Sequence, residues 1–190
     1  MHLNSRLLFK KYAKSLFTTG MRVLEIGPDR NPSTFQKIVG VGRTEWETVD
    51  ICPREALTYV ACDEYHFPVA DETYDIVLSG NVIEHVRKVW LWVRELARIC
   101  KKGGRIVTIN PVSWPYHEAP VDCWRIYPDG MKALYEEAGV KMEFAKHESL
   151  SSSGLMLPVT FIKEALKPVM RKGPPMFGPV IDAIAIGVKV

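Results

Sequence analysis

Residues 23–31 read V-L-E-I-G-P-D-R-N, and this stretch decides the fold. It begins with a short apolar run that carries one acidic residue, Glu25, and the run stops at Gly27-Pro28. This pattern is typical of a buried strand that ends in a turn. Glycine at the turn lets a ligand approach the backbone, because no Cβ stands in the way. Since ligands of open α/β sheets bind outside the carboxyl ends of strands, the stretch predicts a ligand site.

Helices and strands alternate on both sides of this stretch. Such alternation favours a parallel sheet with right-handed crossovers. We therefore expect an α/β, Rossmann-like three-layer sandwich with a mostly parallel, seven-stranded sheet. The patterns predict helices over 3–17, 32–39, 86–100 and 127–138, and strands over 22–27, 44–51, 57–62, 74–79, 105–110, 141–147 and 180–190.

The composition is that of an ordinary globular protein. The 190 residues, 47% hydrophobic and 25% charged, suit one domain over 1–190 with an amino-terminal helix in 1–20. The net charge of +3 is too small to indicate a nucleic-acid partner. Neither a signal peptide nor a transmembrane segment is expected, because residues 1–20 are too charged and no apolar run is long enough.

The cysteines favour reduced thiols in a cytoplasmic protein. None of them forms a C-x-x-C pair, and no histidines stand at zinc spacing from them. No acidic or histidine cluster is apparent along the chain either, so we expect no metal site. The four are Cys52, Cys62, Cys100 and Cys123.

Residues 149–179 form an insertion before the last strand, longer than a turn there requires. The insertion combines apolar residues with cations. This mixture suits a cover over the acceptor site, a dock for a partner subunit or peripheral contact with an anionic membrane surface. Simple packing on the sheet is the favoured interpretation. The oligomeric state does not follow from the sequence.

Acidic residues close two successive predicted strands, Asp50 after the second and Asp63 after the third. A carboxylate at the tip of the second strand can accept hydrogen bonds from ribose hydroxyls. Asp63, one strand further, is placed to accept from the exocyclic amine of adenine. Gly27 and Gly80 leave the backbone bare beneath the rest of the ligand. Together these residues predict an adenosine pocket.

Residues 21–139 resemble the class I S-adenosylmethionine (SAM)-dependent methyltransferases, and most closely those that act on small molecules and cell-surface saccharides. The resemblance implies SAM as the cofactor and a last strand antiparallel to the others. It is carried by V-L-E-I-G-P at 23–28, V-D-I at 49–51, K-K-G-G-R-I-V at 101–107 and, most specifically, the run 61–86 that closes on E-H-V.

The resemblance also implies roles for single residues. Around the adenosine, Asp50 would hold the ribose hydroxyls, Ile51 would pack on adenine and Asp63 would take its amine. The methionine end would be framed by Glu25 and Gly27 and met by the backbone of Gly80 and Asn81.

The chain departs from the family in its turn, which usually reads G-x-G-x-G but here continues from Gly27 as P-D-R-N. Pro28 and its neighbours place side chains where the backbone usually approaches the cofactor. Arg30 or Asn31 is then a candidate contact for the methionine carboxylate. The alternative is a loop that binds SAM weakly or not at all.

The loop 111–125 should face the methyl group, because it follows the carboxyl end of a strand. A hydroxyl acceptor must lose a proton, which suits a histidine or carboxylate base. We expect His117 as the base and Asp122 as its orienting partner or as an alternative base. Trp114, Tyr116 and Trp124 would form the acceptor walls and attract the sulfonium. The competing interpretation is an aromatic-packed lid with a surface histidine.

His85, in the E-H-V motif, belongs to the pocket by resemblance, often with a structural role. From the residue pattern alone, a half-buried histidine with satisfied hydrogen bonds is favoured over a second base.

The sequence thus predicts a SAM-dependent methyltransferase acting on a hydroxyl of a small-molecule or saccharide acceptor. Two other classes remain open. One is a SAM-binding protein without turnover, suggested by the altered turn. The other is an NAD(P)-dependent oxidoreductase on a similar sheet, disfavoured because no G-x-G-x-x-G follows the first strand.

Overall fold

The computed structural model describes residues 3–118, 121–151 and 180–190. Most of the predicted insertion, residues 152–179, lies outside these ranges, and so do the roles expected of it. Among the described residues, no helix combines the length and the apolar character that crossing a bilayer requires.

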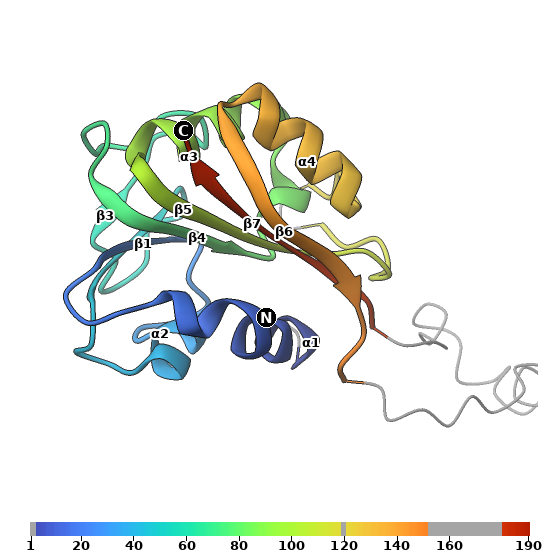
Figure 1. The fold of residues 1–190 in the computed structure, drawn as a ribbon, viewed down its shortest axis with the longest axis horizontal. Coiled ribbons are helices and arrows are strands. Elements are labelled where there is room, and N and C mark those ends of the chain that lie inside the picture. Colours follow the sequence, from blue (N-terminus) through green and yellow to red (C-terminus); the bar gives the residue numbers. More distant parts are fainter. Residues whose placement is uncertain (1–2, 119–120, 152–179) are drawn as a thin grey trace, which may run out of the picture.

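A seven-stranded sheet in the order β3-β2-β1-β4-β5-β7-β6 forms the middle layer (Figure 1). β7 runs antiparallel to both of its neighbours, and the other paired strands are parallel. The mostly parallel sheet and its reversed last strand are both confirmed. The strands are β1 (Arg22–Ile26), β2 (Glu45–Asp50), β3 (Tyr59–Val60), β4 (Tyr74–Gly80), β5 (Cys100–Pro111), β6 (Val140–Glu148) and β7 (Asp182–Lys189).

Helices cover both faces of the sheet (Figure 1). On one face lie α1 (Leu3–Leu8) and α2 (Thr34–Val39). α1 continues as a π-helical turn over Phe9–Ala13 and a 3-10 turn over Lys14–Leu16. On the other face lie α3 (Val89–Ile99) and α4 (Pro128–Glu137). This is the predicted three-layer sandwich.

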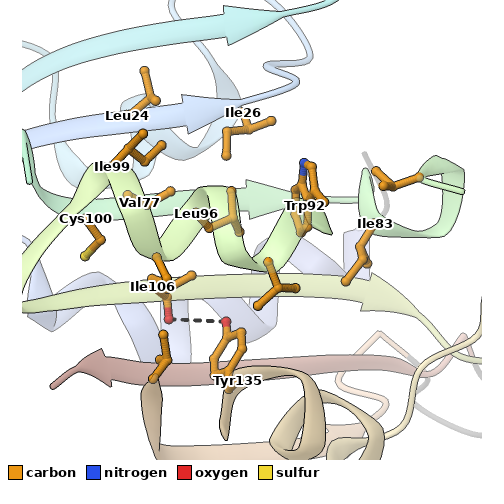
Figure 2. Close-up of a cluster of buried hydrophobic side chains, with 14 of the residues drawn as sticks. Leu24, Ile26, Val77, Ile83, Trp92, Leu96, Ile99, Cys100, Ile106 and Tyr135 are labelled. Atoms are coloured by element: carbon orange, nitrogen blue, oxygen red, sulfur yellow. Dashed lines mark hydrogen bonds between the residues drawn. The ribbon is translucent and has the colours of Figure 1, made fainter. Parts of the chain in front are cut away.

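Each helical layer packs on its own apolar core. Figure 2 shows the core beneath α3, where Trp92 and Leu96 contact the sheet and Tyr135 donates to the carbonyl of Ile106. On the other face, Phe9 and Phe35 pack with their ring centroids 4.4 Å apart. β1 is buried on both faces by these two cores, which explains its nearly continuous apolar sequence.

Three predicted boundaries need correction. β3 spans Tyr59–Val60 instead of 57–62, so Asp63 does not close a strand. Its carboxylate instead accepts from the backbone N–H groups of Tyr65 and His66, which turns the chain away from the sheet. α2 begins after Ser33, whose side chain caps it, so the preceding proline lies outside the first turn. α3 begins at Val89 because residues 83–85 form a separate 3-10 turn.

Candidate cofactor and acceptor site

A cavity of about 480 Å³ opens at the carboxyl ends of β1, β2 and β4. The strand order reverses between β1 and β4, and such a switch point is where open α/β sheets bind ligands. Five residues predicted to bind the cofactor line this cavity, namely Gly27, Asp50, Ile51, Asn81 and His85. Residues that the sequence reasoning missed complete its wall, among them Arg54, Phe67, Val82, Val86 and Trp92.

Gly27 gives the cavity a bare backbone edge. Its φ is +65°, a conformation that residues with a Cβ rarely adopt. A Cβ at this position would lie 2.5 Å from Cγ2 of Val82, which lines the same cavity. The position therefore disfavours any side chain, by conformation and because Val82 would have to shift.

Asp50 ends β2 at the cavity mouth with its carboxylate already engaged. Oδ1 accepts from the N–H of Cys52 at 3.0 Å, and Oδ2 accepts from the guanidinium of Arg54. Arg54 also donates to the carbonyl of Pro28 at 2.9 Å, so it joins the turns that follow β1 and β2. Beside Asp50, the apolar side chain of Ile51 is 40% exposed, which gives a flat ring a surface to cover.

Asn81 carries a polar side chain on the cavity wall after β4. Its backbone has a φ of +58°, and its Oδ1 accepts from the hydroxyl of Ser5 at 3.2 Å. Its Nδ2 is buried and has no hydrogen-bond partner within the described part of the chain. An unpaired buried donor at a cavity wall is the kind of group that a polar ligand atom satisfies.

Other residues predicted to bind the cofactor lie outside the cavity lining. Glu25 is buried in β1, where Nε1 of Trp46 donates to it at 2.9 Å. Burial raises the pKa of Glu25 to about 7, against the lowering effect of its contacts with Ser33 and Trp46. Gly80 is the buried last residue of β4, and Asp63 holds the exposed turn described above.

The altered turn after β1 is ordered by its own side chains. Asp29 accepts from the backbone N–H of Thr34 at 2.9 Å and from its hydroxyl at 2.6 Å. Pro28, Arg30 and Asn31 line a smaller hollow of about 90 Å³ next to the main cavity. Arg30 and Asn31 therefore do not point into the cavity where a methionine carboxylate was expected to reach them.

His117 and Asp122 lie together in the loop that follows β5. Nδ1 of His117 is 3.3 Å from Oδ2 of Asp122 and 3.2 Å from the carbonyl of Pro115. The hydrogen bonds from Arg125 lower the pKa of Asp122 to about 2. Because this buried carboxylate is already paired, its environment suits an orienting partner better than a base.

The three loop aromatics do not line the cavity. Tyr116 is 71% exposed and donates to Glu118. Trp124 donates from Nε1 to the carbonyl of Val86 at 2.8 Å and packs against the core beneath α3. Trp114 accepts a hydrogen bond at its carbonyl from Arg125. In the described structure, Trp124 therefore anchors the loop to the core. This contact favours the competing interpretation, in which aromatic residues pack the loop as a lid.

Glu84, His85 and His117 form a cluster that the sequence reasoning missed. One carboxylate oxygen or ring nitrogen from each lies within 4.8 Å of the others. The expectation of no metal site rested on the absence of such a cluster, and that reason was wrong. The fold brings the ring of His117 within 5.0 Å of the ring of His85, measured between centroids. The N–H of Cys123 donates to the carbonyl of Glu84 at 2.7 Å.

Glu84 is the most buried member of the cluster, with 1% of its surface exposed. Both of its carboxylate oxygens are buried without a hydrogen-bond partner among the described residues. Burial raises its pKa to about 7, with Arg125 acting in the opposite direction. Nε2 of His85 lies 3.8 Å from Oε1 of Glu84.

Comparison with known proteins identifies the class. The model of the family described as "Methyltransferase domain" matches residues 12–108, just over half of the chain. The chain belongs to this family, and its fold is that of the class I SAM-dependent methyltransferases, whose cofactor is S-adenosylmethionine.

Three similar proteins illustrate the match. An uncharacterized methyltransferase of Mycobacterium bovis is 41% identical over 49 residues, which cover 26% of this chain and 19% of that protein. This chain therefore aligns with about a fifth of that relative's length. A SAM-dependent methyltransferase from Archaeoglobus fulgidus has a TM-score of 0.63 at 19% identity, over 97% of this chain and 94% of its own. Phosphoethanolamine N-methyltransferase 2 of Haemonchus contortus, in complex with SAM, has a TM-score of 0.62 at 13% identity, and the match covers 98% of this chain and 52% of that protein.

Proposed function

We propose that this protein transfers a methyl group from SAM to a hydroxyl of a small-molecule or saccharide acceptor. The observation that carries the proposal is the cavity at the switch point of the sheet. There Gly27, Asp50 and Asn81 follow or end three adjacent strands of a chain that belongs to a methyltransferase family. The cluster of Glu84, His85 and His117 adjoins this cavity through His85.

The residues present fit the cofactor. Asp50 would accept hydrogen bonds from the ribose hydroxyls once Arg54 moves aside, and the exposed Ile51 would cover one face of adenine. The bare edge at Gly27 and the unpaired Nδ2 of Asn81 would receive the aminoacyl part. We leave Asp63 out of this proposal, because its carboxylate is committed to a turn outside the cavity.

Besides binding the cofactor, the protein would have to align the acceptor and remove its proton. SAM supplies a methyl group that its sulfonium has already activated, so alignment and exclusion of water are the main requirements. His117 is the proposed base, and the buried Asp122 would orient its ring through Nδ1. The acceptor would lie between this loop and the part of the cavity wall that His85 forms.

The proposal is tested by incubating the protein with SAM labelled in the methyl group and a panel of hydroxyl and amine acceptors. We expect label in a methyl ether of a hydroxyl compound. We also expect His117→Ala to lower kcat by about a hundredfold or more, the usual contribution of a general base, with unchanged SAM affinity. Transfer to amines alone, or full turnover by the variant, would contradict the proposal.

A second candidate function is SAM binding without turnover. The observation that favours it is the turn after β1, where side chains replace the usual glycines and Arg54 occupies the carboxylate of Asp50. Binding of SAM with no methyl transfer to any member of the panel would support this candidate.

A further inference from the structure

We propose that Glu84, His85 and His117 bind a divalent transition-metal cation, which in turn holds the acceptor hydroxyl. The inference deepens the proposed function and rests on it for the identity of the acceptor group. The metal site itself rests on the geometry of the three side chains.

The donor set suits such a cation. Two imidazoles and one carboxylate are a common set for catalytic zinc and for non-haem iron, and they leave positions open for water or substrate. Here one donor atom from each residue already lies within 4.8 Å of the others. Bonds of about 2.0–2.2 Å require these atoms to draw closer. His117 has room to do so, because its side chain is 34% exposed.

Backbone carbonyls hold both imidazoles in an orientation that suits metal binding. Nδ1 of His85 is 2.6 Å from the carbonyl of Val121, and Nδ1 of His117 is 3.2 Å from the carbonyl of Pro115. A carbonyl only accepts, so each Nδ1 carries the proton and each Nε2 keeps its lone pair. Metal-binding histidines typically show this arrangement, in which a carbonyl or carboxylate fixes the tautomer.

The buried carboxyl group of Glu84 also favours a bound cation. Glu84 is buried, and neither of its oxygens has a hydrogen-bond partner among the described residues. Buried carboxylates are normally paired or bound to a metal, because an isolated one is costly to keep out of water. Arg125, the cation that acts on Glu84, is already paired with Asp122. A divalent ion at Nε2 of His85 would reach Glu84, since the two groups are 3.8 Å apart.

A bound cation would activate the acceptor directly. It lowers the pKa of a coordinated hydroxyl as it does that of water, so the proton leaves to solvent. The oxygen then uses an electron pair to bond the methyl carbon, the carbon–sulfur bond breaks, and its pair stays on sulfur. The products are a methyl ether and S-adenosylhomocysteine. In the metal-loaded protein, His117 would act as a ligand in place of its role as base, because the coordinated oxygen would need no separate base; the methyl donor and the hydroxyl acceptor of the proposed function stay the same.

The test is to titrate untagged, chelator-treated protein with Mn²⁺ and follow the free ion by electron paramagnetic resonance. Mn²⁺ is the preferred probe because the exposed thiols of Cys52, Cys62 and Cys123 favour softer ions such as Zn²⁺. We expect one site per chain in the wild type. Glu84→Gln and His117→Ala should each weaken binding by more than about tenfold. His147→Ala serves as the matched control, since His147 makes an edge-to-face contact with Tyr127 outside the cluster, and it should bind as the wild type does.

Circular dichroism and SAM calorimetry on the same samples separate the two proposals. Absence of a Mn²⁺ site in the wild type overturns the metal assignment, and so does equal binding by a folded His117→Ala variant. Either result leaves the proposed function standing if SAM still binds. Failure of SAM to bind refutes the proposed function, whereas the Mn²⁺ stoichiometry still decides the metal site.

Discussion

Glu25 in β1 and Gly27 in the turn after it are two residues apart, but their surroundings differ. Gly27 needs a positive φ and open space at the cavity, whereas Glu25 is a carboxyl group enclosed by the sheet and its helices. The sequence pattern placed both residues in the first strand and its turn, because a strand that ends in glycine at a switch point is a strong local signal. Only Gly27 lines the cavity, so the expected contact of Glu25 with the cofactor is not supported. The pattern gave no measure of how closely Val82 approaches Gly27, since that contact depends on the neighbouring strand.

Gly27→Ala should lower both stability and cofactor affinity. A residue with a Cβ at a φ of +65° costs about 1–2 kcal/mol, and the 2.5 Å approach to Val82 adds to that cost. Urea denaturation and SAM calorimetry measure the two effects. Gly20→Ala is the matched control, because Gly20 has a φ of +82° and nothing within 4 Å of the added Cβ. Equal losses in the two variants would show that the Val82 contact does not matter.

Glu25 should make stability depend on pH. Its pKa is about 7 in the folded protein against an ordinary value of 4.5, so between these values the folded state binds more protons than the unfolded state. The free energy of unfolding therefore falls as pH rises from about 4.5 to about 7, and it is level outside that window. The loss is about 3 kcal/mol at most.

Glu25→Gln should remove this part of the pH dependence and leave the rest. Urea denaturation at pH 5 and pH 7.5 on both proteins gives the difference. Glu84 titrates in the same direction but is present in both proteins, so its effect cancels. Parallel stability profiles for wild type and variant would contradict the account of Glu25.

At the scale of elements, the loop after β5 is held by polar anchors at several points. Nδ2 of Asn110 donates to the carbonyl of Ile126 at 2.8 Å, and Trp124 donates to the carbonyl of Val86. Arg125 pairs with Asp122 and also donates to the carbonyl of Trp114. These contacts bring His117 next to Glu84 and His85, in the part of the site where we propose that the acceptor binds.

Arg125→Ala should loosen this loop without disturbing the cofactor half of the cavity. The change leaves the buried carboxylate of Asp122 without its cation, which is destabilising even though Arg125 itself is 24% exposed. We expect faster proteolytic cleavage between 112 and 127, reduced turnover and SAM affinity within about threefold. Arg105→Ala removes a half-exposed pair with Glu143 and should have little effect. Unchanged cleavage in Arg125→Ala would show that the pair does not hold the loop.

Most elements follow from sequence patterns, because apolar periodicity is local. β3 is the exception, since its two residues are set by pairing with β2 and not by their own sequence. Asp63 was therefore misplaced, and with it the expected adenine contact. The roles of Trp114, Tyr116 and Trp124 were equally hard to predict, because an aromatic residue in a loop gives no sign of whether it faces a cavity or a core.

At the scale of the whole molecule, the strand order explains where the chemistry gathers. β1 and β4 lie at the centre of the sheet and form the switch point, while the antiparallel β7 lies between β5 and the edge strand β6. Sequence reasoning reached this architecture partly through family resemblance, since nothing local specifies the direction of β7. The cluster of Glu84, His85 and His117 could not be predicted from the sequence, because its members come from two loops that only the fold brings together.

The most direct test of the account is calorimetry of SAM and S-adenosylhomocysteine, with NAD as the negative comparison, on wild type and Asp50→Ala. We predict one site per chain for the first two ligands and none for NAD. Asp50→Ala should weaken binding at least about tenfold through loss of charge-assisted hydrogen bonds. Asp129→Ala, in the first turn of α4 outside the cavity, should bind normally. Binding of neither adenosyl ligand, or wild-type affinity in Asp50→Ala, would contradict the central claim.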